Sequence, residues 1–178
     1  TGYNTDYYGA VMALKEMTRI NNKKILVLGA GGAARAVVYG LKKEGALITI
    51  VNRTDVKAKK LADEFKINFG KFNDIQQLVK NCDIIINTTS VGMSPNENQS
   101  ILEEKDLEKD KIVMDIVYKP IKTKLIRIAR KKGCKTVTGD RMLIYQAVRQ
   151  FELWTGINPG FKNMEKGLVS AINKTEKM

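Results

Sequence analysis

Short, continuous apolar runs recur along this chain, and stretches with helical spacing separate them. A strand with one wet face alternates apolar and polar residues, so continuous runs predict strands buried on both faces of a parallel sheet. Their alternation with helices predicts an α/β fold with a doubly wound, mostly parallel sheet of the Rossmann type. The expected strands are residues 24–28, 47–51, 67–72, 83–87, 112–117 and 135–138, of which the third is the weakest.

Helical patterns fill the intervals, at residues 33–43, 55–65, 75–80, 122–132 and 140–154. Gly45 and Gly133 follow two of these segments, as is common at helix C-termini. Thr54 is a candidate N-cap for a third. Two further helical segments, residues 5–18 and 163–174, lie outside the alternation and are expected to flank the sheet at both ends of the chain.

The length of 178 residues suits one domain with a sizeable core, with or without an appended piece. No run of about 18 apolar residues occurs, so no membrane span is expected. The first residues lack the basic and apolar regions of a signal peptide, and we expect a cytoplasmic protein. They also lack an initiator Met, which suggests a fragment whose upstream part is absent.

The chain contains two cysteines, Cys82 and Cys134, which are far apart in sequence, and no histidine. A Cys/His zinc site and any mechanism that needs an imidazole are therefore not expected, and we predict no metal site. Both cysteines adjoin apolar runs, so we interpret them as small residues at the edge of the core in a reducing compartment.

The formal net charge of +12 is compatible with nucleic acid or with an anionic small ligand as partner. The lysines are scattered along the helices, with short basic runs at residues 57–60 and 130–132, and few aromatic residues lie among them. This distribution favours a solvated basic surface with a local anion site, and no nucleic-acid partner is expected.

The glycine-rich turn Gly29-Ala30-Gly31-Gly32-Ala33-Ala34 directly follows the first strand and directly opens a helix. In a dinucleotide site, Gly29 permits the tight turn, Gly31 lets the backbone approach the phosphates, and Ala34 lets the helix pack close to the strand. Free N–H groups and the helix dipole then hold the negative charge. The alternative is a glycine turn that binds nothing.

The end of the second strand discriminates between cofactors. NAD sites usually place an acidic residue there to bind the ribose 2′-hydroxyl, whereas this chain has Asn52, Arg53 and Thr54. Arg53 offers a planar fork that suits a phosphate, and Lys57 follows one helical turn later. We therefore predict NADP rather than NAD, the alternative being that Arg53 is a solvated residue at a strand end.

Residues 87–93 end the fourth strand with the sequence NTTSVGM. Ligands of open α/β sheets cross the carboxyl ends of the strands, so Thr88, Ser90 and Gly92 would let a cofactor ribose or nicotinamide approach. An ordinary strand-to-loop turn explains the same residues equally well.

Taken together, six motifs resemble the shikimate/quinate dehydrogenase family, in the order found there and over nearly the whole chain. They are GYNTD at 2–6, GAGGAAR at 29–35, NRT at 52–54, NTTSVGM at 87–93, DIVYKP at 115–120 and GDRMLIYQA at 139–147. The resemblance implies NADP-dependent, reversible reduction of 3-dehydroshikimate to shikimate in aromatic amino acid biosynthesis.

The resemblance also implies roles for individual residues. Asp6, Tyr118 and Gln146 would face the substrate, and Asp6 would bind a substrate hydroxyl and partner the catalytic lysine. The implied cofactor contacts are Gly29, Ala30, Gly31, Gly32 and Ala33 at the pyrophosphate, Asn52, Arg53, Thr54 and Lys57 at the 2′-phosphate end, and Ile116 and Gly139 at the nicotinamide, with Thr88, Ser90 and Met142 completing the cofactor site.

Hydride transfer to a carbonyl needs a nearby proton donor. The resemblance implies that this donor is a lysine of an N-terminal substrate domain, which the chain does not include. Lys15 lies too far along the helix that begins near Asp6 to replace that lysine. We therefore expect a hinge helix at residues 1–21, an NADP-binding Rossmann domain at 22–144, and C-terminal helices at 145–178 that return to the substrate domain. Such a fragment is expected to bind NADP with little or no turnover.

Two departures from the family pattern lie near the expected substrate cleft: Tyr7 and Tyr8 before Gly9, and Asp140-Arg141 where the family commonly has Leu-Gly. Simpler readings also exist for the substrate residues. Asp6 could be a helix N-terminal carboxylate, Gln146 a surface amide and Tyr118 a half-buried aromatic residue at a strand end. Phe151 and Trp154 are expected in the core.

Two rival functions remain open. One is a quinate/shikimate dehydrogenase that uses NAD, against which the non-acidic Asn52 argues. The other is a non-catalytic nucleotide- or nucleic-acid-binding module, which offers no reason for Asp6, Tyr118 and Gln146 to stand in their motifs. A small-molecule substrate is the expected partner, and a homodimer is possible.

Overall fold

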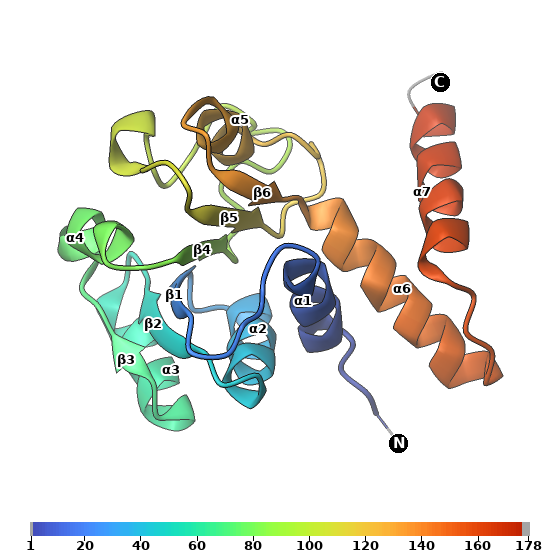
Figure 1. The fold of residues 1–178 in the computed structure, drawn as a ribbon, viewed down its shortest axis with the longest axis horizontal. Coiled ribbons are helices and arrows are strands. Elements are labelled where there is room, and N and C mark those ends of the chain that lie inside the picture. Colours follow the sequence, from blue (N-terminus) through green and yellow to red (C-terminus); the bar gives the residue numbers. More distant parts are fainter. Residues whose placement is uncertain (1, 176–178) are drawn as a thin grey trace.

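Six parallel strands form one sheet in the order β3-β2-β1-β4-β5-β6, with helices on both faces (Figure 1). The computed structural model describes residues 2–175. This strand order is that of a doubly wound Rossmann sheet, so the predicted fold class is confirmed. The strands are β1 Lys24–Leu28, β2 Leu47–Val51, β3 Asn68–Phe69, β4 Ile84–Asn87, β5 Ile112–Asp115 and β6 Lys135–Val137.

Within the described residues, seven α-helices and two short 3-10 helices connect and flank the strands. They are α1 Asp6–Lys15, α2 Gly32–Lys43, α3 Asp55–Phe65, α4 Ile75–Lys80, α5 Lys124–Lys131, α6 Gly139–Thr155 and α7 Phe161–Thr175, with η1 Phe72–Asp74 and η2 Glu104–Asp106. None of the helices in this part of the chain is long and apolar enough to span a bilayer.

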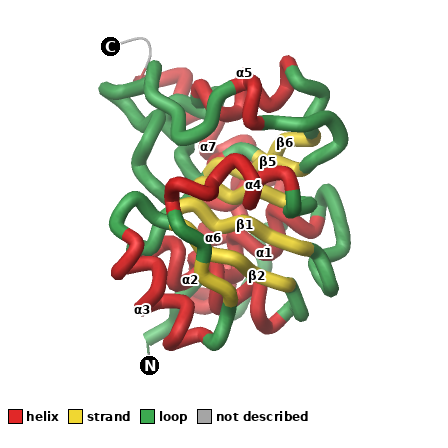
Figure 2. Tube along the Cα trace, turned by 90° about the vertical axis from the view of Figure 1, so that its left-hand side faces the viewer, coloured by secondary structure: helices red, strands yellow, loops and turns green. Residues whose placement is uncertain are grey.

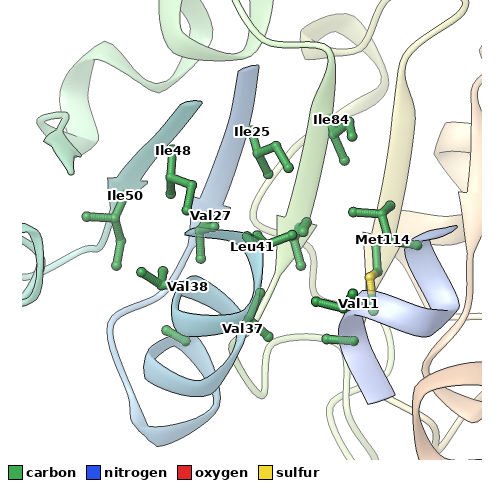
Figure 3. Packing of buried hydrophobic residues seen from close by; sticks show 14 of the residues in the cluster. Val11, Ile25, Val27, Val37, Val38, Leu41, Ile48, Ile50, Ile84 and Met114 are labelled. Carbon is green, nitrogen blue, oxygen red and sulfur yellow. The ribbon is translucent and has the colours of Figure 1, made fainter. Parts of the chain in front are cut away.

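The strands bury alternate residues against the two helical layers. On one face, Ile25 and Val27 of β1 pack with Val37 and Leu41 of α2, in the core shown in Figure 3. Residues of α1, α3 and α6 join the same cluster. On the other face, Leu26 and Leu28 pack against α4 and α5. Burial on both sides explains why the strand sequences are continuously apolar.

Four strands are shorter than predicted: β4 and β6 by one residue each, and β3 and β5 by more. β3 pairs only with β2 at the edge of the sheet, and after Gly70 the chain turns into η1. β5 ends at Asp115, because the Val117 N–H donates to the Asp115 carboxylate (3.1 Å) instead of continuing the ladder. Residues 116–118 therefore lie in the loop that follows β5 at the carboxyl end of the sheet (the β5 loop).

The helix ends predicted from Gly45, Gly133 and Thr54 agree with the structure, whereas the helix predicted over 5–18 ends already at Lys15. Gly45 and Gly133 have φ values of 77° and 80°, which is the left-handed conformation expected after a helix. Thr54 occupies the N-cap position of α3, although its side chain makes no capping hydrogen bond.

Helices α6 and α7 extend beyond the edge of the sheet (Figure 1). α1 packs against both α2 and α6, so it belongs to the same body as the sheet. The expectation that Phe151 and Trp154 lie in the core is wrong: their exposed fractions are 37% and 80%. Both residues lie in the last turns of α6, where the helix has run past the strands that bury its beginning.

Candidate functional site

The glycine turn lies at the point where the sheet changes winding direction, between the carboxyl ends of β1 and β4. Gly29 has a φ of 108°, and a Cβ there would lie 2.7 Å from Thr89 Cγ2 and 2.8 Å from Thr88 Oγ1. Both its conformation and this close approach therefore require glycine. The Gly29 N–H donates to Val51 O, which ties the turn to the end of β2.

The start of α2 offers an open cradle for an anion. Gly31 is the N-cap and Gly32 the first helical residue, and a Cβ at either position would meet no atom within 4 Å. Ala30 and Ala33 keep the side chains around this point small. The first N–H groups of an α-helix lack intrahelical partners, and the open space beside the start of this twelve-residue helix fits the pyrophosphate of a dinucleotide.

Two contiguous cavities extend from this cradle, with volumes of about 730 and 360 Å³, and they share residues from the ends of β1, β2 and β4. The smaller cavity is lined by Gly29, Ala30, Gly31, Asn52, Arg53, Thr54, Lys57, Thr88, Thr89 and Ser90. Nine of these ten were predicted as cofactor residues, so the structure brings that part of the predicted site together.

Basic groups line the β2 side of the smaller cavity. Asn52 Nδ2 donates to Thr54 O (3.0 Å), which shapes the turn that carries Arg53. Within the described residues, neither Arg53 nor Lys57 forms an ion pair with a carboxylate. The neighbouring Asp55 accepts a hydrogen bond from Phe72 N–H (3.2 Å). The positive charge is therefore left for a ligand such as a phosphate.

Buried polar side chains organise the ends of β4 and β5. Asn87 and Asp115 are paired across the two strands, and their exposed fractions are 1% and 0%. Asn87 Nδ2 donates to Asp115 Oδ1 (3.0 Å), and Thr123 Oγ1 donates to Asp115 Oδ2 (2.7 Å). Burial raises the pKa of Asp115, while the hydrogen bonds from Thr123, Val117 and Asn87 oppose that rise.

The residues predicted for the nicotinamide lie around the start of α6. A Cβ on Gly139 would lie 2.4 Å from Val117 O and 2.5 Å from Ile116 O, so the helix begins directly against the β5 loop. Ile116 is partly buried, whereas Met142 is only 5% exposed and its side chain belongs to the core cluster. None of these residues lines the two cavities described above.

The predicted substrate residues come from α1, α6 and the β5 loop. Gln146 Nε2 donates to Asp6 Oδ1 (2.5 Å), so these two side chains, 140 residues apart, are in direct contact. Gln150 donates to Thr5 Oγ1 one turn further along α6. Tyr118 is 53% exposed and lies in the loop after β5, next to Val117, whose N–H donates to the Asp115 carboxylate.

The residues at the two departures from the family pattern contact neighbouring helices. Arg141 donates to Glu16 and to Glu165 of α7, and it lies over the Phe161 ring (4.1 Å to the centroid). Tyr7 packs edge to face against Tyr39 of α2, and Tyr8 lies beneath Arg149.

Asp140 precedes Arg141 in the second departure and lies in the first turn of α6. Its Oδ1 atom is buried and has no hydrogen-bond partner within residues 2–175. Arg141, in contrast, serves as a tether between helices.

Several residues of the larger cavity were missed from the sequence. Phe72, Lys124 and the loop residues Asn98, Gln99, Ser100 and Ile101 complete its lining. The loop has no periodicity and Lys124 begins a helix far along the chain, so only the rule that ligands gather at carboxyl ends of strands could have indicated them.

The cysteines agree with the structural interpretation. Both are free and buried, and burial raises the pKa of Cys82 to about 11. Within the described residues, no group of three or more potential metal ligands comes together.

Comparison with known proteins identifies the family. The family model described as shikimate / quinate 5-dehydrogenase matches residues 11–128, and that of the shikimate 5′-dehydrogenase C-terminal domain matches residues 141–167. The chain is 44% identical over 173 residues to the shikimate dehydrogenase (NADP(+)) of Pyrococcus abyssi, covering 97% of this chain and 64% of that protein. The chain thus spans about 64% of the length of the curated relatives it matches.

Solved structures give the same result. A shikimate dehydrogenase crystallised with NADP+ is 40% identical with a TM-score of 0.89, over 96% of this chain and 62% of that one. A quinate dehydrogenase from Corynebacterium glutamicum, in complex with NAD, is 31% identical with a TM-score of 0.88, over 96% and 63%. With its glycine turn, sheet order and two matching family models, the chain belongs to the shikimate/quinate 5-dehydrogenase family.

Proposed function

We propose that the chain is the cofactor-binding part of an NADP-dependent shikimate dehydrogenase, which reduces 3-dehydroshikimate to shikimate reversibly. The observation that carries this proposal is the pairing of an open glycine cradle with Arg53 and Lys57, which have no carboxylate partner in the described residues. The chain spans only about 64% of its relatives' length, so the activity of the whole enzyme is part of this proposal.

In this proposal, NADPH supplies the hydride when it is bound. The N–H groups at Gly31 and Gly32 would hold the pyrophosphate, and the Arg53 guanidinium would form charge-assisted hydrogen bonds with the 2′-phosphate. Lys57 adds a second positive charge one helical turn away. A carboxylate in place of Asn52 would repel that phosphate and would suit the free ribose hydroxyl of NAD.

The remaining predicted contacts lie on the nicotinamide and substrate side. Ile116 and Gly139, which are in contact through the β5 loop, would receive the nicotinamide, and Thr88 and Ser90 the adjoining ribose. The position of Thr88 and Ser90 in the lining of the smaller cavity supports their assignment. That of Ile116 and Gly139 is supported by their position after the carboxyl end of β5, where ligands of such sheets bind.

Asp6 and Gln146 would bind substrate hydroxyls as a pair, with Tyr118 facing the same region. Their hydrogen bond supports this assignment, because it already orients an acceptor and an amide toward each other at the junction of α1 and α6.

The proton donor is proposed to come from a substrate domain outside residues 1–178. Lys15, the lysine nearest to Asp6 along α1, is paired with Glu44, the C-cap residue of α2, at 2.8 Å. Within the described residues, Asp6 has no ion pair with any lysine. The division into a hinge helix at 1–21, a cofactor domain at 22–144 and returning helices at 145–178 follows from this view, with α6 running across the second boundary.

An activity assay combined with NADPH titration tests the proposal. The chain alone should bind NADPH, detected by nicotinamide fluorescence, yet should not reduce NADP at 340 nm in the presence of shikimate. Sustained NADPH production by the chain alone would show that its own residues supply the proton donor. Failure to bind NADPH would remove the proposed cofactor role.

Arg53 provides the sharper variant. Arg53→Ala should raise the Kd for NADPH by about ten- to a hundredfold, the usual cost of losing hydrogen bonds from a charged group, and should change the Kd for NADH by less than about twofold. Lys59→Ala is the matched control, because Lys59 is an exposed basic residue of α3, the helix that follows Arg53, and lines neither cavity. Equal losses for both cofactors would contradict recognition of the 2′-phosphate by Arg53.

A further inference from the structure

The Asp115 carboxylate is fully buried at the carboxyl end of β5, and all of its hydrogen-bond partners in the described residues are uncharged. Oδ1 accepts from Asn87 Nδ2 (3.0 Å) and from the Val117 N–H (3.1 Å), and Oδ2 accepts from Thr123 Oγ1 (2.7 Å). A buried carboxylate without a cation is costly, and a well-packed apolar residue would stabilise the fold more. Packing alone therefore does not explain its presence.

Its three partners belong to three separate segments. Asn87 ends β4, Val117 lies in the loop after β5, and Thr123 is the N-cap of α5, where its Oγ1 also accepts from Ile126 N–H. Because each segment is bound to the same carboxylate, their relative positions depend on that group.

Asn87 carries the constraint into the next loop. Its Oδ1 accepts from the Thr89 N–H (3.0 Å) and the Thr89 hydroxyl (2.7 Å), while its Nδ2 also donates to Val91 O (3.3 Å). The Thr89 hydroxyl in turn accepts from the Val91 N–H (3.1 Å). The turn at residues 88–91, which lines both cavities, is thus held by the pair of Asn87 and Asp115.

We propose that Asp115 is a positioning residue for the cofactor. It fixes the loops at residues 88–91 and 116–118 relative to each other, so that they receive the ribose and nicotinamide, and it is not itself among the residues that line the cavities. This role rests on the proposed function, and it concerns the loops that would receive the ribose and nicotinamide. The charged contacts of the adenosine end would come from Arg53 and Lys57, which Asp115 does not contact.

The hydrogen bonds distinguish a carboxylate from an amide of the same size. Asn87 Nδ2 and the Val117 N–H can only donate, so an amide at position 115 must keep its oxygen toward them and turn its Nδ2 toward Thr123 Oγ1. The Thr123 hydroxyl would then have to accept this N–H in addition to that of Ile126, and its own O–H would lose its acceptor, so Asp115→Asn should disturb the arrangement at Thr123.

The experiment compares two ligands on the chain as it exists. NADPH reaches both ends of the site, whereas adenosine 2′,5′-bisphosphate reaches only the adenosine end and carries the same 2′-phosphate. Asp115→Asn should raise the Kd for NADPH about tenfold and weaken the fluorescence change of the bound nicotinamide, with the Kd for the bisphosphate within about twofold of the unmodified chain. Asp83→Asn is the control, because Asp83 accepts a backbone N–H at the opposite end of β4.

Three results would overturn the positioning role. An unchanged Kd for NADPH would show that the carboxylate is not needed, and equal losses for both ligands would indicate a general structural defect. Tighter binding of NADPH would mean that the charge of Asp115 acts mainly by repelling phosphate. Failure of the unmodified chain to bind NADPH would instead overturn the proposed function, and the positioning role with it.

A second pair of variants covers the case in which Asp115→Asn does not fold. Thr123→Val removes one donor to Asp115 with little change in volume, and Thr123→Ser retains it. The valine variant should raise the Kd for NADPH but not that for the bisphosphate, and the serine variant should bind both ligands like the unmodified chain. Equal behaviour of the two variants would contradict the proposal.

Discussion

At the scale of single residues, the proposed cofactor site is built from close approaches between backbone atoms and small side chains. Gly139 begins α6 against the carbonyl oxygens of Ile116 and Val117, at distances that leave no room for a Cβ. Gly29 is similarly pressed against Thr88 and Thr89. These contacts bring the ends of β1, β4 and β5 together at one edge of the sheet.

Replacing Gly139 tests how rigid this contact is. Gly139→Ala places a methyl group against backbone atoms, which cannot move as a flexible side chain does, and should destabilise the chain by about 1–3 kcal/mol in urea unfolding. Gly167→Ala is the matched control within α7, because a Cβ there meets nothing within 4 Å and alanine favours a helix. A neutral Gly139→Ala would show that the β5 loop adjusts freely.

The thiol of Cys82 provides a residue-scale prediction about pH. Its raised pKa, about 11, and its burial mean that almost no thiolate is present or accessible near pH 8. A disulfide reagent such as DTNB should therefore react with neither buried cysteine until the chain unfolds. Rapid labelling of native protein at pH 8, measured at 412 nm, would contradict this.

At the scale of elements, Arg141 of α6 connects the following helix, α7, with the end of α1, which lies 125 residues away in sequence. Its guanidinium pairs with Glu16 beyond the end of α1 and with Glu165 of α7, and Tyr145 also donates to Glu16 (2.8 Å). The Phe161 ring packs on both Arg141 and Tyr145. Within the described residues, α7 packs against α6 and lies away from the sheet (Figure 1), and the contacts of Arg141 link it to the end of α1.

Removing the guanidinium should therefore release α7. Arg141→Gln is expected to cost about 1 kcal/mol, because the pairs are partly exposed, and to speed amide exchange in α7 while leaving the sheet protected. Arg149→Gln is the control, because the partner of Arg149, Glu152, lies in the same helix. Equal exchange of α7 in both variants would contradict the tether.

The same cluster predicts an alkaline effect. Burial and the hydrogen bond to Glu16 raise the pKa of Tyr145 to about 12, from an ordinary value of 10.0. Since the folded-state pKa is the higher one, the stabilisation by Tyr145 is fully present below about pH 10 and is lost as the pH rises through about 12. The stability advantage over Tyr145→Phe should shrink across that interval in urea unfolding, and a constant difference would contradict the assignment.

At the scale of the whole molecule, periodic features were the ones the sequence could predict. Continuous apolar runs indicated the sheet, which Figures 1 and 2 show among its helices from two directions, and the turn at Gly29 indicated its nucleotide edge. The features that the sequence did not predict depend on which residues of neighbouring strands lie side by side and on which distant side chains line the same cavity. The pairing of Asn87 with Asp115, and the entry of Lys124 into the larger cavity, arise only when strands align.

The exposure of Trp154 illustrates the same limit. Helical spacing shows which residues of α6 share a face, but not where the helix leaves the sheet. Trp154 is the only tryptophan in the chain and is 80% exposed, so its fluorescence should resemble that of indole in water and be readily quenched by acrylamide. A blue-shifted, protected emission would mean that another surface covers the end of α6 in solution.

The central claim is that the glycine cradle belongs to an NADP site, and relative cofactor affinity tests it most directly. The Kd values of the unmodified chain for NADPH and NADH, measured by fluorescence titration at the same ionic strength, should differ by at least about tenfold in favour of NADPH. That result is expected because Arg53 and Lys57 face the cavity without a carboxylate partner in the described residues. Equal affinities, or tighter binding of NADH, would contradict the account.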